Sequence, residues 1–349
     1  MLAFNKILIN ICHFFLVLYK NLRKRIVPKP IILNFLHYLC ATSIVYSMSS
    51  KKKIPVKSKF HLKNRNKDKY DLSALVLHTP ELESHIKTNI IGESTVDFTN
   101  PTAINILNKA LLGYYYDVKS WNFPDDYICP QIPKSADYIH HIADLLKLSN
   151  FGRLPKSDLI TCLDIGTGAT CIFPILGSIE YNWNFIGSDI DDEALKIASE
   201  IVASNSTLPS SINFKLQENT KDFFYGILDR KDKVDLTICS PPTLSPIKGE
   251  NLPKELLYDG GDLKFNRDMI KQSKKFASNC FWFTTIVSSQ NNLKNTQKLL
   301  DELGAIQVID LPLENGKKGK KILAWSFLGK SEQNEWRTSR WGMKKKIDL

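Results

Sequence analysis

Two short segments of the sequence carry the residue types that a group-transfer site needs. The first is a glycine-rich bend, Asp164-Ile165-Gly166-Thr167-Gly168, which follows an apolar run and precedes a predicted helix. Gly166 and Gly168 let the backbone approach a ligand closely, and a helix N-terminus offers unpaired N–H groups. Asp189 closes the next predicted strand, where a carboxylate can accept both hydroxyls of a ribose. This pattern predicts a nucleoside cofactor site.

The glycine pattern distinguishes between two kinds of cofactor. A dinucleotide fingerprint has a third glycine, but the residues after Gly168 are Ala, Thr, Cys, Ile and Phe. Such a bend favours a cofactor without a pyrophosphate, so S-adenosylmethionine fits it better than NAD. Asp164 would face the amino group and Asp189 the ribose, while Thr220 or Gln217, after the third strand, is placed to approach the adenine. The alternative is a structural glycine turn with two capping aspartates.

The second segment is the acceptor turn, Ser240-Pro241-Pro242-Thr243, which follows an apolar run at 234–239. Ligands of open parallel sheets bind beyond the carboxyl ends of the strands, so we expect this turn to face the cofactor. An exocyclic adenine nitrogen is a weak nucleophile because its lone pair is delocalised, and an enzyme must hold it in line and accept its hydrogens. We assign catalysis to this turn: the Ser240 side chain and the Pro241 carbonyl are the acceptors, and the prolines fix the backbone.

The alternation of strands and helices after residue 158 predicts the elements that position these residues. Seven candidate strands follow one another, with helical segments predicted between the first five. This order is typical of an α/β fold with a doubly wound, mostly parallel sheet. Before it, the sequence has helical periodicity, and Pro80 and Pro101 stand at predicted first helical positions. The strands are predicted at 159–164, 184–188, 212–216, 234–239, 280–287, 306–310 and 322–327.

Positive charge is concentrated near the N-terminus. The chain has 349 residues, 43% of them hydrophobic, and a formal net charge of +11. Its first 67 residues contain 14 Lys and Arg and no acidic residue, so the rest is slightly acidic. A basic arm on a near-neutral body is suited to a phosphate backbone, because each cation releases condensed counterions; a solvated tail is the alternative. We expect residues 51–70 to form a flexible basic strap.

The same patterns divide the chain into four parts. We predict a hydrophobic and then basic, partly disordered arm at 1–70, and a helical RNA-binding or lid region at 71–150. A methyltransferase domain follows at 151–330, and a basic tail at 331–349.

Two further features concern the compartment. Seven cysteines lie far apart without a CxxC pair or a zinc-ligand spacing, so we expect no metal and a reducing compartment, nucleus or cytoplasm. The apolar run at 7–19 is shorter than the ~20 residues of a membrane-spanning helix. Three interpretations stay open, namely a targeting segment, an interfacial anchor, or sequence upstream of a second start at Met48; membrane contact is the less expected of these.

Several stretches between residues 61 and 327 resemble sequence motifs of one known family, and they occur in the same order. They include Lys63-Asn64-Arg65, Asn100-Pro101, Cys129-Pro130-Gln131-Ile132-Pro133, Gly187-Ser188-Asp189, Asp259-Gly260-Gly261-Asp262 and Ala324-Trp325-Ser326-Phe327. The acceptor turn resembles the (Asp/Asn/Ser)-Pro-Pro-(aromatic) motif of amino-methyltransferases. Together they are similar to the family that joins bacterial large-subunit rRNA adenine-N6 methyltransferases with eukaryotic methyltransferase-like 16 proteins, which modify U6 snRNA.

That resemblance implies a Rossmann-like class I S-adenosylmethionine-dependent methyltransferase with a seven-stranded, mostly parallel sheet and a small N-terminal helical region. It implies methylation of adenine N6 in a structured RNA, either U6 snRNA or large-subunit rRNA, by a monomer that does not act on DNA. It places Gly166, Thr170, Asp189 and Ser240 at cofactor-contacting positions. The RNA contacts are expected at Lys63, Arg65, Lys67, Lys69 and Lys134.

The sequence departs from the family pattern at the acceptor turn. Family members usually have Asn-Pro-Pro-Phe, whose ring stacks on the flipped adenine and contributes ~1–3 kcal/mol. Thr243 cannot stack, and Ser240 reaches less far than asparagine. An alternative function is therefore an RNA-binding protein that keeps the methyltransferase fold with weakened catalysis. A dehydrogenase is a more distant alternative, because the glycine fingerprint is incomplete.

Overall fold

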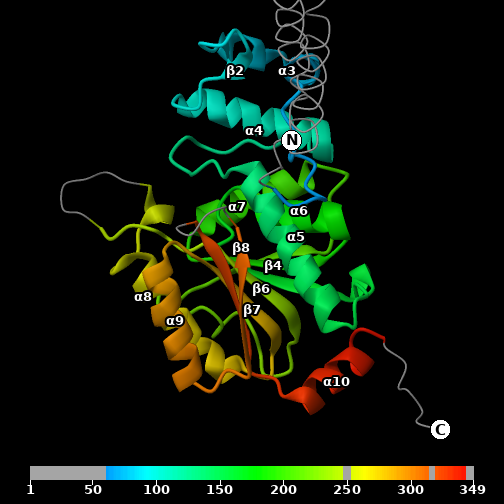
Figure 1. Ribbon diagram of the computed structural model, residues 1–349, viewed down its shortest axis with the longest axis vertical. Coiled ribbons are helices and arrows are strands. Elements are labelled where there is room, and N and C mark those ends of the chain that lie inside the picture. The colour runs from blue at the N-terminus through cyan, green and yellow to red at the C-terminus, as the bar shows by residue number, and fades with distance from the viewer. Residues whose placement is uncertain (1–59, 247–252, 314–318, 343–349) are drawn as a thin grey trace, which may run out of the picture. The chain divides into compact units, whose positions relative to one another are not determined.

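The computed structural model describes residues 60–246, 253–313 and 319–342 (Figure 1). The hydrophobic segment and most of the predicted basic arm lie outside the described residues, as does the end of the predicted tail. Contacts within the chain divide it into Met1–Lys57 and Ser58–Leu349, so everything described here belongs to one unit. Among the described residues, no helix has the length and hydrophobicity needed to cross a membrane.

Seven strands of the described chain form one sheet in the order β5-β4-β3-β6-β7-β9-β8. β9 runs antiparallel to β7 and β8, and the other neighbouring pairs are parallel. All seven predicted strands are present, with ends shifted by at most two residues, which confirms the predicted α/β fold. The strands are β3 Thr161–Ile165, β4 Asn184–Asp189, β5 Ile212–Leu216, β6 Val234–Cys239, β7 Cys280–Val287, β8 Gln307–Pro312 and β9 Lys321–Ser326.

Helices cover both faces of the sheet and enclose two hydrophobic cores. α5, α6 and α7 pack on one face, and α8 and α9 pack on the other (Figure 1). In β6, Leu236 and Ile238 belong to the first core, whereas Val234 and Cys239 belong to the second. Burial on both faces explains why the central strands are mainly apolar. The helices are α5 Ile132–Ser149, α6 Ile172–Tyr181, α7 Asp192–Ala203, α8 Gly261–Ser273, α9 Gln290–Glu302 and α10 Lys330–Ser339, with 3-10 turns η2 Ser157–Leu159, η3 Lys254–Leu256 and η4 Lys274–Phe276.

A small helical region precedes the sheet, as predicted, and it also contains a short β-hairpin. Asn100 caps α4 by accepting the N–H groups of Thr102 and Ala103, with Pro101 at the first helical position. The hairpin strands β1 and β2 have three residues each, too few for an alternating pattern to predict them. The elements are α3 Leu72–His78, η1 Pro80–His85, β1 Ile86–Thr88, β2 Ser94–Val96 and α4 Pro101–Tyr116.

The connection between β5 and β6 differs from the prediction of a helix. Residues 217–233 form turns. Their large side chains pack directly on the second core, so this part of the sheet is covered without a helix. The side chains that do this are Phe223, Phe224, Ile227 and Leu228.

The described part of the predicted strap, residues 60–70, is folded against α5. Asn64 is buried, and its Nδ2 donates to the Pro133 carbonyl at 2.8 Å and to Asp137 Oδ1 at 2.5 Å. The His61 N–H donates to the same carboxylate oxygen at 2.9 Å. The prediction of a flexible strap is therefore wrong for these residues, because their polar groups pair with groups on the helix.

The described part of the predicted basic tail contacts the centre of the sheet. Asp235 in β6 is fully buried, and its Oδ1 accepts the indole N–H groups of Trp336 at 2.7 Å and Trp341 at 2.8 Å. Arg340 forms an ion pair with Oδ2 at 3.0 Å. Buried carboxylates are stable only when paired and hydrogen-bonded. α10 and residues 340–342 are therefore a structural part of the domain.

Replacing Asp235 with alanine should destabilise the protein by about 3–5 kcal/mol, because two buried indole N–H groups and Arg340 lose their anion. The free energy of unfolding in urea measures this. Glu302→Ala is the control, since it removes an exposed ion pair to Lys298 at 3.8 Å and should change the free energy by at most ~0.5 kcal/mol. Equal losses in both variants would contradict this role for Asp235.

Candidate active site

The ends of three neighbouring strands bring the predicted cofactor and acceptor residues to one edge of the sheet. β3 lies between β4 and β6 and is parallel to both. Ile165 at its end pairs with Ser188 on one side and with Cys239 on the other. Ligands bind at this edge in open α/β sheets. The residues that directly follow these three paired positions are Gly166, Asp189 and Ser240.

Hydrogen bonds to the end of β4 hold the glycine bend. The N–H groups of Gly166 and Thr167 donate to the Ser188 carbonyl at 2.9 and 3.0 Å, and the Gly168 N–H donates to Asp189 Oδ2 at 2.8 Å. Gly166 and Gly168 have φ angles of 73° and 62°, which strongly favour glycine. A Cβ on Gly166 would meet no atom within 4 Å. This side of the bend is therefore open with respect to the described residues.

Asp189 is a half-buried carboxylate that keeps acceptor capacity. Besides the Gly168 N–H, it accepts the Asp191 N–H on Oδ1 at 3.1 Å. Burial raises the pKa of this carboxyl, and the backbone N–H groups of Gly168, Asp191 and Ile190 oppose the shift. Each carboxylate oxygen has a second lone pair, so Asp189 can accept hydroxyl groups in addition to these bonds.

Asp164, near the end of β3, is a buried carboxyl without a partner. Asp164 is 1% exposed, and neither of its carboxyl oxygens forms a hydrogen bond with any described residue. Burial raises its pKa to about 7; the nearby Thr167 hydroxyl opposes this shift, and the negative charge of Asp189 adds to it. A buried carboxylate without a partner is unfavourable until a cation or a donor pairs with it. An ammonium group bound beside the bend would supply that partner.

A buried tyrosine fixes the strand end that presents the acceptor turn. The Cys239 N–H donates to the Tyr138 hydroxyl at 3.4 Å, and this hydroxyl lies 2.9 Å from Thr284 Oγ1. Tyr138 belongs to α5 and Thr284 to β7, so both elements hold the position of Ser240, whose side chain is exposed. The sequence pattern predicts no role for Tyr138, because the periodicity of an apolar helix face does not indicate which hydroxyl group forms a hydrogen bond.

The two residues predicted to approach the adenine have different surroundings. Gln217 is buried, and its Nε2 donates to the Tyr225 carbonyl at 2.9 Å, so it stabilises a turn. Thr220 is exposed in the loop after β5. Of the other predicted positions, Thr170 and Pro241 are buried, Pro242 is half-buried and Thr243 is exposed.

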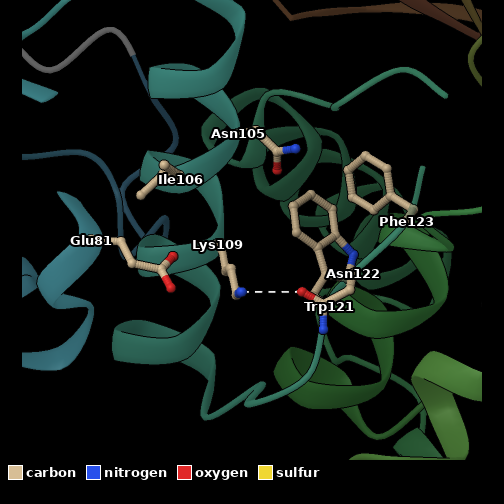
Figure 2. A pocket seen from close by; sticks show the side chains of 7 residues that line it. All are labelled: Glu81, Asn105, Ile106, Lys109, Trp121, Asn122 and Phe123. Atoms are coloured by element: carbon tan, nitrogen blue, oxygen red, sulfur yellow. Dashed lines mark hydrogen bonds between the residues drawn. The ribbon is translucent and has the colours of Figure 1, made fainter. Parts of the chain in front are cut away.

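Trp121 joins the segment after α4 to the glycine bend. Its indole N–H donates to the Thr170 carbonyl at 3.0 Å, and its ring contacts Phe123 edge-on with centroids 4.8 Å apart. The two rings line a pocket of about 130 Å³, where Lys109 Nζ donates to Asn122 Oδ1 at 3.1 Å (Figure 2). Neither the glycine bend nor the acceptor turn lines this pocket, so it does not mark the cofactor site.

The residues predicted to contact RNA have mixed surroundings, and their role stays a prediction. Arg65 is engaged in the fold: its Nε pairs with Glu180 at 2.8 Å, and its guanidinium lies over the Tyr116 ring, 5.0 Å from the centroid. The other four are Lys63 over the Tyr181 ring, Lys67 bonded to the Leu62 carbonyl, Lys69 paired with Glu93, and Lys134 half-buried in the first turn of α5.

Of the described histidines, His140 is a buried part of the fold. Among the described residues, no group of three or more His, Cys, Asp or Glu side chains could hold a metal ion. His140 is buried, and its Nδ1 lies 2.9 Å from the Tyr181 hydroxyl. Burial lowers its pKa to about 4, so it is neutral at pH 7.

Comparison with known proteins assigns these features to one family. The family described as RNA methyltransferase matches residues 54–251 and 244–329. The chain belongs to this RNA methyltransferase family. Two bacterial relatives are both named ribosomal RNA large subunit methyltransferase F. The protein of Cytophaga hutchinsonii is 39% identical over 317 residues, which are 84% of this chain and 98% of that protein. The protein of Pseudomonas paraeruginosa is 37% identical over 310 residues, which are 81% and 93%.

Solved structures of the family have the same fold. The N-terminal domain of human METTL16 in complex with SAH has a TM-score of 0.66 and 27% identity, covering 77% of this chain and 99% of that one. The human METTL16 catalytic domain in complex with MAT2A 3′UTR hairpin 1 has a TM-score of 0.67 and 25% identity, covering 78% and 97%. The family and the class I methyltransferase fold expected from the sequence are thereby confirmed.

Asp164 should make the ligand-free protein less stable as the pH rises. Its carboxyl ionises near pH 4 in an unfolded chain but with a pKa of about 7 in the folded protein. The folded state therefore binds more protons between these values, and the stability present at low pH is lost as the pH rises through 7.

Asp164→Asn should remove this dependence. The unfolding free energy of the wild type should fall by roughly 1–3 kcal/mol more than that of the variant between pH 5 and pH 8. Urea denaturation across this range measures the difference, with the exposed Asp125→Asn as a control that keeps the wild-type slope. Identical slopes for wild type and Asp164→Asn would contradict the buried, partnerless carboxyl.

Proposed function

We propose that this chain transfers a methyl group from S-adenosylmethionine to N6 of an adenine in a structured RNA. The observation that carries the proposal is the adjacency of the glycine bend, Asp189 and the acceptor turn at the ends of β3, β4 and β6. Membership of the RNA methyltransferase family supports RNA as the methylated molecule. The human METTL16 domain in complex with SAH supports the cofactor type.

The residues at the bend suit this cofactor. The partnerless carboxyl of Asp164 fits its ammonium group, the open side of Gly166 allows close backbone approach, and the remaining lone pairs of Asp189 fit the ribose hydroxyls. When bound, S-adenosylmethionine supplies an electrophilic methyl group on a positively charged sulfur. Negative charge near the bend stabilises that cation, and more strongly in a partly buried site than in water.

The acceptor turn suits an adenine amino group. The exposed Ser240 hydroxyl and the Pro241 carbonyl can each accept one of its two hydrogens. This orients the nitrogen, which lowers the entropic part of the barrier. Little base strength is needed, because a proton leaves readily once the nitrogen is cationic. The turn has Thr243 where the family usually has an aromatic ring, so stacking worth ~1–3 kcal/mol is missing.

Large-subunit rRNA is the substrate class that we favour, with U6 snRNA as the alternative. The relatives named for large-subunit rRNA are 37% and 39% identical to this chain, compared with 25% and 27% for the METTL16 structures. Lys69 has 69% of its side chain exposed and can approach phosphates without reading sequence. Selectivity would then come from RNA shape and from unpaired bases.

Asp189→Ala and Ser240→Ala should each reduce methyl transfer by at least ~100-fold, but for different reasons. The first removes the ribose acceptor and should also weaken cofactor binding, whereas the second should leave cofactor binding close to wild type. Calorimetry with S-adenosylmethionine and radiolabelled transfer to large-subunit rRNA, followed by nucleoside analysis for N6-methyladenosine, separate the two effects. Full activity in both variants would refute the site.

The same assay tests the alternative function of an RNA-binding protein with weakened catalysis, which Thr243 and Ser240 favour. A wild-type chain that binds the cofactor and RNA but methylates no RNA would support that alternative.

Thr243→Phe should restore base stacking and lower the KM for RNA by about 5-fold or more, the equivalent of ~1–3 kcal/mol. Thr207→Phe, at another exposed threonine, is the control for nonspecific binding by an added ring. Steady-state kinetics with a short RNA containing the target adenosine measure the effect. An equal gain in both variants, or none at position 243, would contradict a stacking role for this position.

A further inference from the structure

The segment from 253 to 258 is attached to the acceptor turn. The Leu244 N–H, one residue after the turn, donates to the Leu256 carbonyl at 2.9 Å, and the Tyr258 N–H donates to the Leu244 carbonyl at 3.0 Å. Leu244 and Leu257 form a parallel bridge. The 3-10 turn η3 is therefore held beside the residues proposed to bind the adenine.

Glu255 extends from η3 to the glycine bend. Its Oε2 accepts the Ile128 N–H at 2.7 Å. A Cβ on Gly168 would lie 2.6 Å from Glu255 Oε1, so the carboxylate occupies the space beside this glycine and would have to shift if the glycine carried a side chain. The Ala169 N–H also stabilises the charged form of Glu255. One carboxylate thus contacts the bend and the extended segment that leads into α5.

These contacts join three parts of the site that are far apart in the sequence. Gly168, which Glu255 packs against, donates its N–H to Asp189, the predicted ribose acceptor. Ile128 lies at the start of the segment that leads into α5, whose Tyr138 holds the end of β6. The pairing of β3 with β6 fixes Ser240 relative to the bend, so a shift of Glu255 would free η3 and Leu244, just after the acceptor turn, to move relative to the bend.

We propose that Glu255 is a positioning residue for methyl transfer: it holds the acceptor turn and η3 against the cofactor bend, so that the adenine and the methyl donor share one geometry. This inference rests on the proposed function of the site. None of the family motifs found in the sequence includes this residue.

The charge of Glu255 fits the same role. Burial raises its pKa, the N–H groups of Ile128 and Ala169 lower it, and the charges of Asp189 and Asp191 raise it. Several carboxylates therefore surround the bend, and a cationic cofactor relieves their repulsion. Glu255 should accordingly support binding of the cation as well as fix the backbone.

Hydrogen exchange of the ligand-free protein tests the contacts without any activity. In Glu255→Ala, the amide groups of Ile128 and Ala169 should exchange at least ~10-fold faster than in wild type, because local opening no longer breaks a bond to a carboxylate. Glu255→Gln, which keeps one acceptor oxygen, should give intermediate rates. Glu200→Ala, at an exposed position on α7, is the matched control and should match wild type, and the melting temperatures should lie within a few degrees of one another.

Cofactor binding and kinetics test the role in methyl transfer. Glu255→Ala should bind S-adenosylmethionine about 10-fold more weakly than wild type by calorimetry, and the KM for S-adenosylmethionine should rise. Glu255→Gln should lie between wild type and Glu255→Ala in both quantities. If the wild type binds S-adenosylmethionine normally, but amide exchange and cofactor affinity are unchanged in Glu255→Ala, the positioning role of Glu255 is wrong. The proposed function of the site is then unaffected. Tighter binding in Glu255→Ala would also overturn it, since Glu255 would then block the site. A wild-type chain that binds no S-adenosylmethionine would overturn the proposed function, and this role with it.

Discussion

The hydrogen bonds between the glycine bend and the end of β4 are the constraint on which the site depends. The Ser188 carbonyl accepts two N–H groups of the bend, and the Asp189 carboxylate accepts a third. The bend therefore cannot move without moving β4, and the open side of Gly166 stays at a fixed position beside Asp189. Because β3 also pairs with β6, the same constraint fixes the bend relative to Ser240.

Negative charge around the bend connects the stability of the protein with the type of ligand it can bind. Burial raises the pKa values of Asp164, Asp189 and Glu255, and neighbouring carboxylates add to each shift. Without a ligand this arrangement weakens the fold at neutral pH. A cation bound there removes the repulsion, so the features that reduce stability are the ones that favour a cationic ligand over a neutral or anionic one.

The sheet and the outline of the site could be predicted from the sequence, because both depend on local patterns. Strands buried on both faces are apolar runs, and parallel strands end at one edge, which places Gly166, Asp189 and Ser240 together. The sequence did not reveal Tyr138 or Glu255, because their contacts involve partners 101 and 127 residues away along the chain. It also suggested a helix between β5 and β6 where bulky side chains in turns cover the sheet instead.

The link between Asp235 and α10 has a consequence for biosynthesis. The indole groups of Trp336 and Trp341 follow their acceptor by 101 and 106 residues. While the nascent chain leaves the ribosome, β6 therefore emerges long before the two indole donors and Arg340, which pair with its buried carboxylate. The domain should therefore complete folding only after residues 336–341 have left the ribosome.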